Sequence, residues 1–163
     1  MAKAKNTGGK ATGSPKKSGE VTLRPVNELD IEPVCAIDEK LSGKDRPGEW
    51  ERRISYYIRR DPELSLVAVE GARVVGFMLG EVRAGEFGLE EPAGWIEVLG
   101  VDPACQGRSV GKKLLEGMLA GFKARGCKAV RTLVNETGQK ELLGFFEAGG
   151  FKSTPIRTLE RKA

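Results

Sequence analysis

Residues 98–115 read VLGVDPACQGRSVGKKLL, and this stretch decides the fold. Its apolar start predicts the end of a buried strand, which Asp102 and Pro103 terminate. Its second half opens a helix over about residues 108–125, where apolar side chains recur at helical spacing. Between them lies a glycine-bearing loop at the helix N-terminus, where backbone N–H groups lack partners and the helix dipole is positive. The stretch therefore predicts an anion-binding site at residues 106–112.

Other glycine loops that join a strand to a helix fit this stretch less well. Residues 107–111, GRSVG, match the GxSxG nucleophile elbow of hydrolases, but the chain contains no histidine to activate Ser109. A Walker A loop needs four residues between its glycines and Ser or Thr after its lysine, whereas here three residues intervene and Lys113 follows Lys112. The dinucleotide fingerprint GxGxxG is absent. A loop whose glycines only permit a tight turn stays as an alternative interpretation.

The pattern of the remaining chain predicts a single α/β domain over residues 20–162. We expect an edge strand at residues 21–26, two helices at 30–42 and 46–60, and a hairpin of two strands at 64–70 and 73–83. Two further strands at 94–101 and 128–134 are joined by the helix at about 108–125, and a last helix at 140–148 precedes one or two closing strands at 151–160. Residues 95–134 form a strand, crossover helix and strand, for which a parallel pairing is expected.

The distribution of charged and apolar residues along the chain excludes some classes of function. The 163 residues carry a net charge of +4, but five lysines precede Glu20, and the rest of the chain holds 22 basic and 23 acidic residues. A nucleic-acid-binding surface on the folded part is therefore not expected, and residues 1–19 are predicted to be a disordered, Lys-rich tail. No run approaches the roughly 18 apolar residues of a membrane span, so we expect a cytoplasmic protein with no membrane partner.

The chain also lacks the residue types of several common sites. It contains no histidine, which excludes a histidine base, a Ser-His-Asp triad and a His-ligated metal. Its three cysteines show no CxxC spacing, so reduced thiols are expected and no metal site is predicted.

Residues 106–111, QGRSVG, resemble the Q/R-x-x-G-x-G/A pyrophosphate loop of the GNAT acetyltransferase superfamily. As in that superfamily, the loop follows a strand ending in Val-x-Pro, at residues 101–103, and opens a Leu-rich helix, at residues 112–115. Residues 145–151 match the aromatic residue that precedes Gly-Phe near the C-terminus of its members. The resemblance covers about residues 20–162. It implies the acyl-CoA N-acyltransferase fold, an α/β fold with a single mixed, mostly antiparallel central sheet flanked by helices.

The resemblance also implies the chemistry. We expect an N-acetyltransferase that transfers an acetyl group from acetyl-CoA to a primary amine of a protein or small molecule, by direct attack of the neutral amine. Backbone N–H groups of the loop hold the pyrophosphate in such enzymes, and the edge of the preceding strand pairs with pantetheine and offers a donor to the oxyanion. The residues expected to bind the cofactor are Leu99, Gly100, Val101, Gln106, Gly107, Arg108, Ser109, Val110, Gly111 and Lys112. A monomer and a homodimer both stay open.

Glu97 is the candidate catalytic base. With no histidine in the chain, the proton of the amine has to pass to a carboxylate or to water. Glu97 lies in the central strand and has the same parity as Leu99 and Val101, so we expect it to share their side of the strand. Glu81, on the preceding strand, is the second candidate. A carboxylate that faces the acceptor cleft without taking a proton is the alternative interpretation.

Two residues depart from the family pattern. Ser109 stands where the family usually has the first glycine of the loop, so either its φ is negative or serine tolerates the turn. Phe146 stands where many members carry a tyrosine that protonates the departing thiolate, so the thiolate must take a proton from water or leave unassisted. A catalytically weak acyl-CoA-binding protein is therefore one alternative function. A nucleic-acid-associated module that uses the Lys-rich tail is another.

Overall fold

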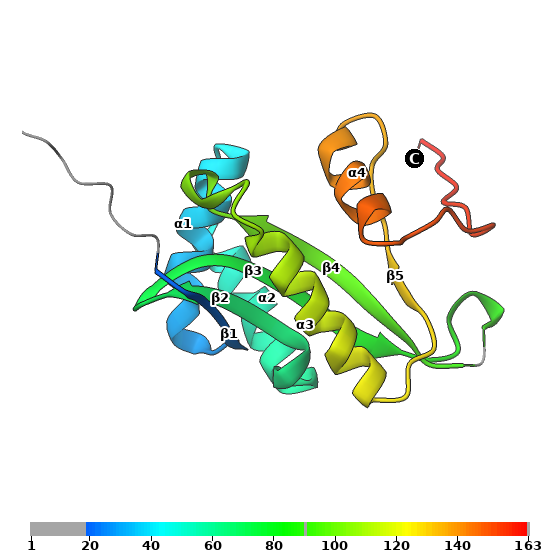
Figure 1. Cartoon of the computed structure of the whole chain (residues 1–163). Helices are drawn as coiled ribbons and strands as arrows, with labels where there is room; N and C mark the ends of the chain where they lie inside the picture. Colours follow the sequence, from blue (N-terminus) through cyan, green and yellow to red (C-terminus); the bar gives the residue numbers. More distant parts are fainter. Residues whose placement is uncertain (1–18, 90, 163) are drawn as a thin grey trace, which may run out of the picture.

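A computed structural model describes residues 19–89 and 91–162. Its strands are β1 (Val21–Pro25), β2 (Ser65–Glu70), β3 (Arg73–Arg83), β4 (Ala93–Val101) and β5 (Val130–Thr132), and its helices are α1 (Ile31–Ser42), α2 (Pro47–Arg60), α3 (Val110–Ala124) and α4 (Lys140–Ala148). The strands form one five-stranded sheet in the order β1-β2-β3-β4-β5 (Figure 1). The Lys-rich tail predicted over residues 1–19 lies, except for Gly19, outside the described residues.

The first half of the sheet follows the predicted hairpin. β2 and β3 are antiparallel and turn at Gly71, whose φ of +62° lies in the left-handed region that favours glycine. β1 pairs antiparallel with β2 at the edge of the sheet. Pro25 is tolerated there because an edge strand does not need every N–H group for a ladder.

The second half contains the predicted parallel unit. β4 is antiparallel to β3, β5 is parallel to β4, and α3 connects β4 to β5. Only this pair of strands is parallel among the described residues, so the sheet is mixed and mostly antiparallel, as expected.

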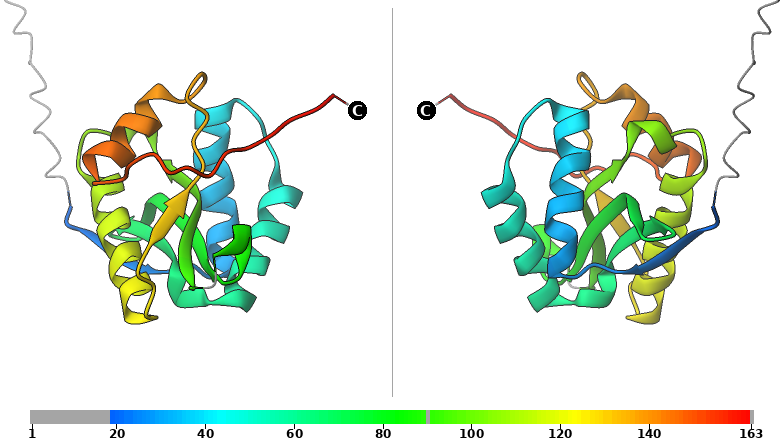
Figure 2. Two further views of the ribbon diagram at one scale, coloured as in Figure 1. Left: turned by 90° about the vertical axis from the view of Figure 1, so that its right-hand side faces the viewer. Right: turned by 90° about the vertical axis from the view of Figure 1, so that its left-hand side faces the viewer.

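Two apolar layers hold the helices to the sheet. α1 and α2 cover one face and α3 and α4 cover the other (Figure 2). On the first face, Trp50 of α2 packs edge-on against Phe77 of β3, with ring centroids 5.2 Å apart. On the second face, Met118 and Phe122 of α3 are fully buried. Both helices thus bury the side chains that their helical spacing places on one face.

The C-terminal segment differs from the expectation. Residues 151–162 contain no strand, although one or two closing strands were predicted at 151–160. The apolar residues there, Phe151, Ile156 and Leu159, are separated by odd numbers of positions, so neighbours fall on opposite faces of an extended chain. No single apolar face can form, and Leu159 is almost fully exposed.

Two element boundaries also differ. β5 covers three residues rather than residues 128–134, because its pairing with β4 ends at Thr132. α3 begins at Val110 rather than near residue 108, because Ser109 before it has a φ of +60° and cannot be part of a right-handed helix. Among the described residues, no helix is both long and apolar enough to cross a bilayer.

Candidate functional site

A β-bulge at Glu97 shapes the middle of β4. Ile96 lies opposite Gly80 and Val98 lies opposite Leu79, so Glu97 is an extra residue without a partner in β3. A bulge shifts the alternation of side chains along the strand. Glu97 pairs with Arg83 on the face covered by α1 and α2, where Val98 also packs.

The bulge corrects the parity argument made from the sequence. Leu99 and Val101 pack against the apolar cluster that contains α3, on the other face of the sheet from Glu97. Glu97 would share a face with Leu99 and Val101 only in a regular strand, and the extra residue reverses the faces beyond it.

Beyond the bulge, one edge of β4 is open. β5 pairs with Gly94, Trp95 and Ile96 only, and the two strands separate from there on (Figure 1). The N–H group of Asp102 donates to Val75 of β3. Because backbone groups alternate along a strand, the peptide groups of Leu99 and Val101 face away from β3, toward the open edge.

Gly100 lies between those two residues, on the face covered by α1 and α2. A Cβ atom there would stand 2.6 Å from the ring of Phe77. Only glycine therefore lets β4 lie this close to the Phe77 ring.

Asp102 fixes the chain where β4 ends. Its carboxylate is buried and accepts from Lys40 of α1 at 2.9 Å, from Arg73 of β3 at 2.5 Å and from the N–H group of Ala104 at 3.0 Å. Burial by itself would raise the pKa of Asp102, but the bonds from Lys40, Ala104 and Arg73 outweigh it and lower the pKa to about 2. The start of the loop is thereby tied to the sheet and to α1.

The loop then presents a row of free N–H groups. Two residues with left-handed backbone, Gly107 (φ +73°) and Ser109 (φ +60°), turn the chain into α3. The first backbone bond of the helix runs from the N–H group of Lys113 to Ser109, at 3.0 Å. Within residues 19–89 and 91–162, nothing accepts from the N–H groups of residues 107–112. These donors lie at the positive end of the helix dipole.

Two of the polar side chains of the loop, unlike its backbone N–H groups, already have partners within the described part of the protein. Gln106 donates to the carbonyl oxygen of Val101 at 3.4 Å, across the open edge. Arg108 is paired with Glu70 at the end of β2, with 2.5 Å between nitrogen and oxygen, and lowers the pKa of Glu70. Lys112 is exposed, and its only ion pair among the described residues is a distant one, 3.9 Å from Glu116.

The two candidate carboxylates differ in how they are held. Glu81 is buried and accepts three hydrogen bonds, from Tyr56 at 2.9 Å, Arg83 at 2.8 Å and Arg60 at 3.1 Å. Burial opposes the effect, but these donors lower the pKa of Glu81, which makes it a weak base. Glu97 is partly exposed and forms an ion pair with Arg83, at 2.8 Å. Of the two, Glu97 is the carboxylate open to a substrate.

A sequence model of the acetyltransferase (GNAT) family matches residues 31–151. The chain belongs to the GNAT family. Among curated relatives, an acetyltransferase of Pectobacterium atrosepticum is 25% identical over 140 residues, which cover 86% of this chain and 94% of that protein. The family assignment makes the protein an acetyl-CoA-dependent acyltransferase, as the sequence predicted.

Solved structures of acetyltransferases share the fold. The aminoglycoside N-acetyltransferase AAC(6')-Iy in complex with CoA is 18% identical, with a TM-score of 0.76 over 91% of this chain and 99% of that chain. Ard1 from Thermoplasma volcanium is 25% identical, with a TM-score of 0.70 over 82% of this chain and 84% of that chain. The predicted fold class is confirmed.

Both departures from the GNAT pattern are visible in the structure. Ser109 keeps the left-handed backbone that a glycine would adopt there, so serine tolerates the turn rather than avoiding it. Phe146 is buried, with its ring 5.2 Å from that of Phe145 and 5.0 Å from that of Phe151. No hydroxyl group stands at this position to donate a proton.

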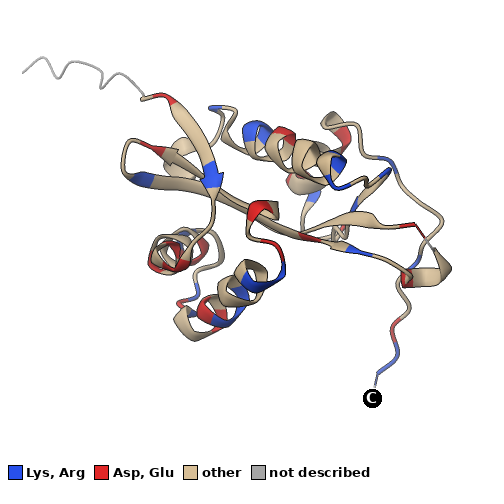
Figure 3. Cartoon of the chain, turned by 90° about the horizontal axis from the view of Figure 1, so that it is seen from below, with Lys and Arg blue, Asp and Glu red and all other residues tan. Residues whose placement is uncertain are grey.

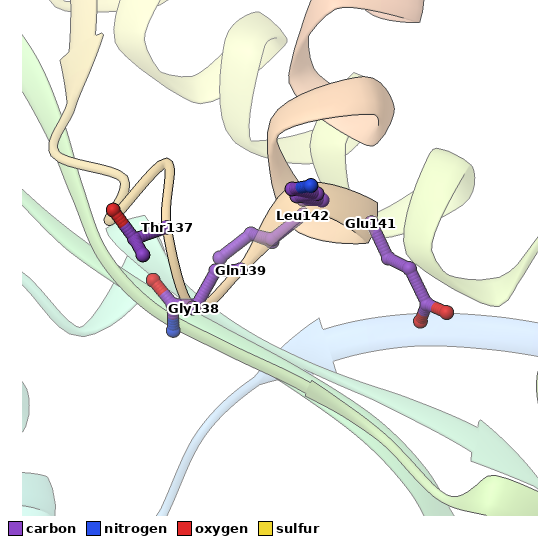
Figure 4. Close-up of a pocket in the computed structure, with 6 residues that line it drawn as sticks. Thr137, Gly138, Gln139, Glu141 and Leu142 are labelled. Atoms are coloured by element: carbon purple, nitrogen blue, oxygen red, sulfur yellow. The ribbon is translucent and has the colours of Figure 1, made fainter.

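A hollow of about 450 Å³ lies at the N-terminus of α4, beyond the end of β5. Figure 4 shows Thr137, Gly138 and Gln139 on the loop before the helix, and Glu141 and Leu142 on its first turn. Asn135 shapes this loop by accepting from the N–H groups of Thr137 and Gly138. This loop follows β5, the strand that separates from β4, and so lies past the end of the β4–β5 pairing, near the open edge of β4.

Sequence reasoning missed Arg83, which contacts both candidate carboxylates. A signal was present, because Glu81 and Arg83 are charged residues two positions apart at the end of an otherwise apolar strand. Residues at that spacing share a face, so an ion pair between them was predictable.

Proposed function

We propose that this GNAT acetyltransferase binds acetyl-CoA along the open edge of β4 and transfers the acetyl group to a primary amine, with Glu97 accepting the proton of the amine. One observation carries the proposal: in the part of the chain that the structure describes, the N–H groups of residues 107–112 have no acceptor, and they follow directly from a strand edge that no other strand pairs with. A diphosphate needs several donors in one place, and an extended amide chain needs a strand edge.

The backbone supplies the binding groups. N–H groups of residues 107–112 hold the pyrophosphate at the N-terminus of α3, where the helix dipole favours negative charge. The peptide groups of Leu99 and Val101 pair with pantetheine as a neighbouring strand would. One N–H group of this edge donates to the oxygen that gains charge during attack.

Of the predicted side chains, Lys112 is the one available to add positive charge near the phosphates. Arg108 is engaged with Glu70, so its contribution requires that this ion pair open.

Glu97 supplies the base. At pH 7, removing the proton from a lysine side chain costs roughly 4.6 kcal/mol and from an α-amine roughly 1.4 kcal/mol, given their ordinary pKa values of about 10.4 and 8. A lysine acceptor therefore depends on the carboxylate more than an N-terminal acceptor does. The thiolate of CoA leaves without a protein acid at Phe146 and takes its proton from water, which is tolerable for a thiol with a pKa of about 8.5.

The alternative within the same fold is an acyl-CoA-binding protein with little turnover. Phe146 in place of a tyrosine favours it, because the structure offers no hydroxyl group there. A nucleic-acid-associated module is less favoured, since positions of basic and acidic residues are interspersed along the helices and strands rather than grouped by sign (Figure 3). It predicts steeply salt-dependent binding that is lost when residues 1–19 are deleted.

A panel of amines tests the proposal. The protein is incubated with acetyl-CoA and, separately, a peptide with a free α-amine, an N-terminally blocked peptide with one lysine, a polyamine and an aminoglycoside. Release of free CoA and the mass of the amine product are measured. We expect at least one amine to gain one acetyl group. Binding of acetyl-CoA without any acetylated amine would support the weak-turnover alternative, and absence of binding would overturn both.

A further inference from the structure

Arg83 is the centre of a charged network on the face covered by α2. Its Nε lies 2.8 Å from Glu81 of the same strand, and its Nη2 lies 2.8 Å from Glu97 of β4. Its Cζ stands over the ring of Trp95, 5.4 Å from the centroid. Arg83 is opposite Ala93 in the register, so its side chain runs along β4 past Trp95 to reach the bulge.

Glu81, the other carboxylate bound by Arg83, is anchored to α2. Glu81 accepts from Tyr56 and Arg60 of that helix as well as from Arg83. Because a guanidinium group is planar and donates in fixed directions, anchoring Nε on Glu81 and stacking the group on Trp95 leaves little freedom for Nη2. The nitrogen that faces Glu97 is therefore held in place from two sides.

Glu97 is held differently from Glu81. Among the described residues, its carboxylate is held by an ion pair of Oε1 with Nη2 of Arg83, at 2.8 Å. That contact occupies Oε1, so Oε2 is the oxygen left for an incoming ammonium group. Glu97 is also the first residue of the open edge of β4, where the acetyl group is expected.

We propose that Arg83 is a positioning residue for the transfer reaction: it holds Oε1 of Glu97 beside the open edge while leaving Oε2 to accept the proton of the amine. This inference rests on the proposed function of Glu97. A base about 1 Å out of place can lose on the order of 10²-fold in rate, so fixing one flexible glutamate on an irregular strand matters for turnover.

Other charges surround the pair. Glu81 and Arg83 face Glu97 from β3, and Arg53, Tyr57 and Arg60 face the network from α2. Glu86, on the short 3-10 helix Glu86–Gly88, approaches Arg83 to 3.8 Å. Of these groups, Arg83 is the one whose ion pair reaches Glu97, so replacing Glu86 provides a matched control.

The test compares Arg83→Gln, Arg83→Lys and Glu86→Gln in the full chain, with the most reactive amine of the panel. We expect Arg83→Gln to lower kcat at least about 10-fold at neutral pH, with an unchanged affinity for acetyl-CoA. Arg83→Lys should recover only part of this loss, because an ammonium group cannot bridge Glu81 and Glu97 as a fork does. Glu86→Gln should stay within about 2-fold of wild type.

Two measurements on Arg83→Gln, its kcat in the Glu97→Gln background and the pH dependence of its kcat, distinguish positioning of Glu97 from a purely structural role of Arg83. In the Glu97→Gln background, Arg83→Gln should cause little further loss of kcat, since the group it positions is gone. The loss from Arg83→Gln should also shrink as pH rises and free amine becomes abundant, in parallel with that from Glu97→Gln. An equal loss in both backgrounds, or a loss independent of pH, overturns the proposal.

A crystal structure of Arg83→Gln gives a readout that needs no acceptor. We expect the carboxylate of Glu97 to move or to occupy several positions while β4 keeps its bulge. A carboxylate that stays in place overturns the positioning role even if the enzyme proves active. If no amine is acetylated by the wild type, the proposed function fails instead, and the two failures are distinguishable.

Discussion

Glu97 and Leu99 lie two residues apart on β4 and point to opposite faces of the sheet, although residues at that spacing share a face in a regular strand. The bulge at Glu97 causes this arrangement. It places the carboxylate on the side of α2 and leaves the peptide groups of Leu99 and Val101 in the plane of the sheet, at the open edge. In the proposed function, the acceptor approaches from the side of α2 and the acyl donor lies along the edge.

Replacing the proposed base should slow the reaction without weakening donor binding. Glu97→Gln keeps the shape of the side chain but cannot accept a proton, so kcat should fall by about 10-fold for an α-amine and by roughly 10²-fold or more for a lysine. The loss should shrink as pH rises toward the pKa of the acceptor. Rate profiles between pH 6 and 10, with calorimetry of acetyl-CoA binding, check this. A loss that stays constant with pH points to a structural role for Glu97.

Ser109→Gly should stabilise the protein. A left-handed backbone costs a residue with a Cβ about 1–2 kcal/mol, and glycine gives back about 0.5–1 kcal/mol through its flexible unfolded state, so the free energy of unfolding should rise by up to about 1.5 kcal/mol. Urea unfolding measures it. Ser55→Gly, inside α2 with an ordinary helical backbone, is the control and should lower stability by about 0.5 kcal/mol. A decrease for Ser109→Gly would mean that serine makes a contact that offsets the strain.

Phe146 offers a test of how the thiolate leaves. Phe146→Leu should lower stability by about 1 kcal/mol through lost packing against Phe145 and Phe151, and should leave kcat within a few-fold of wild type. Phe146→Tyr should raise kcat only if its hydroxyl group comes within roughly 3 to 3.5 Å of the sulfur, and by no more than about 10²-fold. Steady-state kinetics of both variants decide. If Phe146→Leu proves as damaging as Glu97→Gln, the aromatic ring is not a passive wall.

Asp102→Asn should destabilise the start of the loop at neutral pH but not in acid. The pKa of Asp102 is about 2 in the folded protein and near 3.8 for a free side chain, so its ionised form stabilises the fold above pH 4. That contribution is lost as pH falls from about 4 to 2. We expect Asp102→Asn to lower the free energy of unfolding by about 1–2 kcal/mol at pH 7. Most of the difference from wild type should be gone at pH 2, where Asp102 is half protonated in the folded protein, as urea unfolding at both pH values would show.

The sequence predicts the loop and helix well because they depend on local signals. Val-x-Pro ends β4, Gly107 allows a left-handed turn, and regular apolar spacing marks α3. The left-handed backbone of Ser109 and the helix start at Val110 were not predicted. The same local logic cannot predict the bulge, since one extra residue in a strand leaves the local composition unchanged. Whether Glu97 shares a face with Leu99 depends on that bulge, so the sequence singles out Glu97 as a candidate but does not predict its orientation.

The contact between Arg83 and Glu97 also could not be predicted from the sequence. It joins a residue near the end of β3 to one four positions past its partner in β4, and a shift of one residue in the register would break it. The prediction of closing strands at residues 151–160 was wrong for another reason. Residues 151–160 include β-branched residues, but strand propensity without an alternating apolar face gives a segment nothing to bury.

Whether CoA binds at the loop before α3 is best measured by calorimetry of CoA binding to Gly111→Val, with Gly48→Val as the control. Both glycines are the second residue of a helix, but a Cβ at Gly111 would stand 3.2 Å from the ring of Phe145, whereas one at Gly48 has no neighbour closer than 3.7 Å. To admit a branched side chain at position 111, either the Phe145 ring or the first turn of α3, which carries the free N–H groups, must shift. We predict at least about 10-fold weaker CoA binding for Gly111→Val, measured where thermal unfolding shows it folded, and wild-type affinity for Gly48→Val. Wild-type affinity in folded Gly111→Val would contradict a CoA site at this loop.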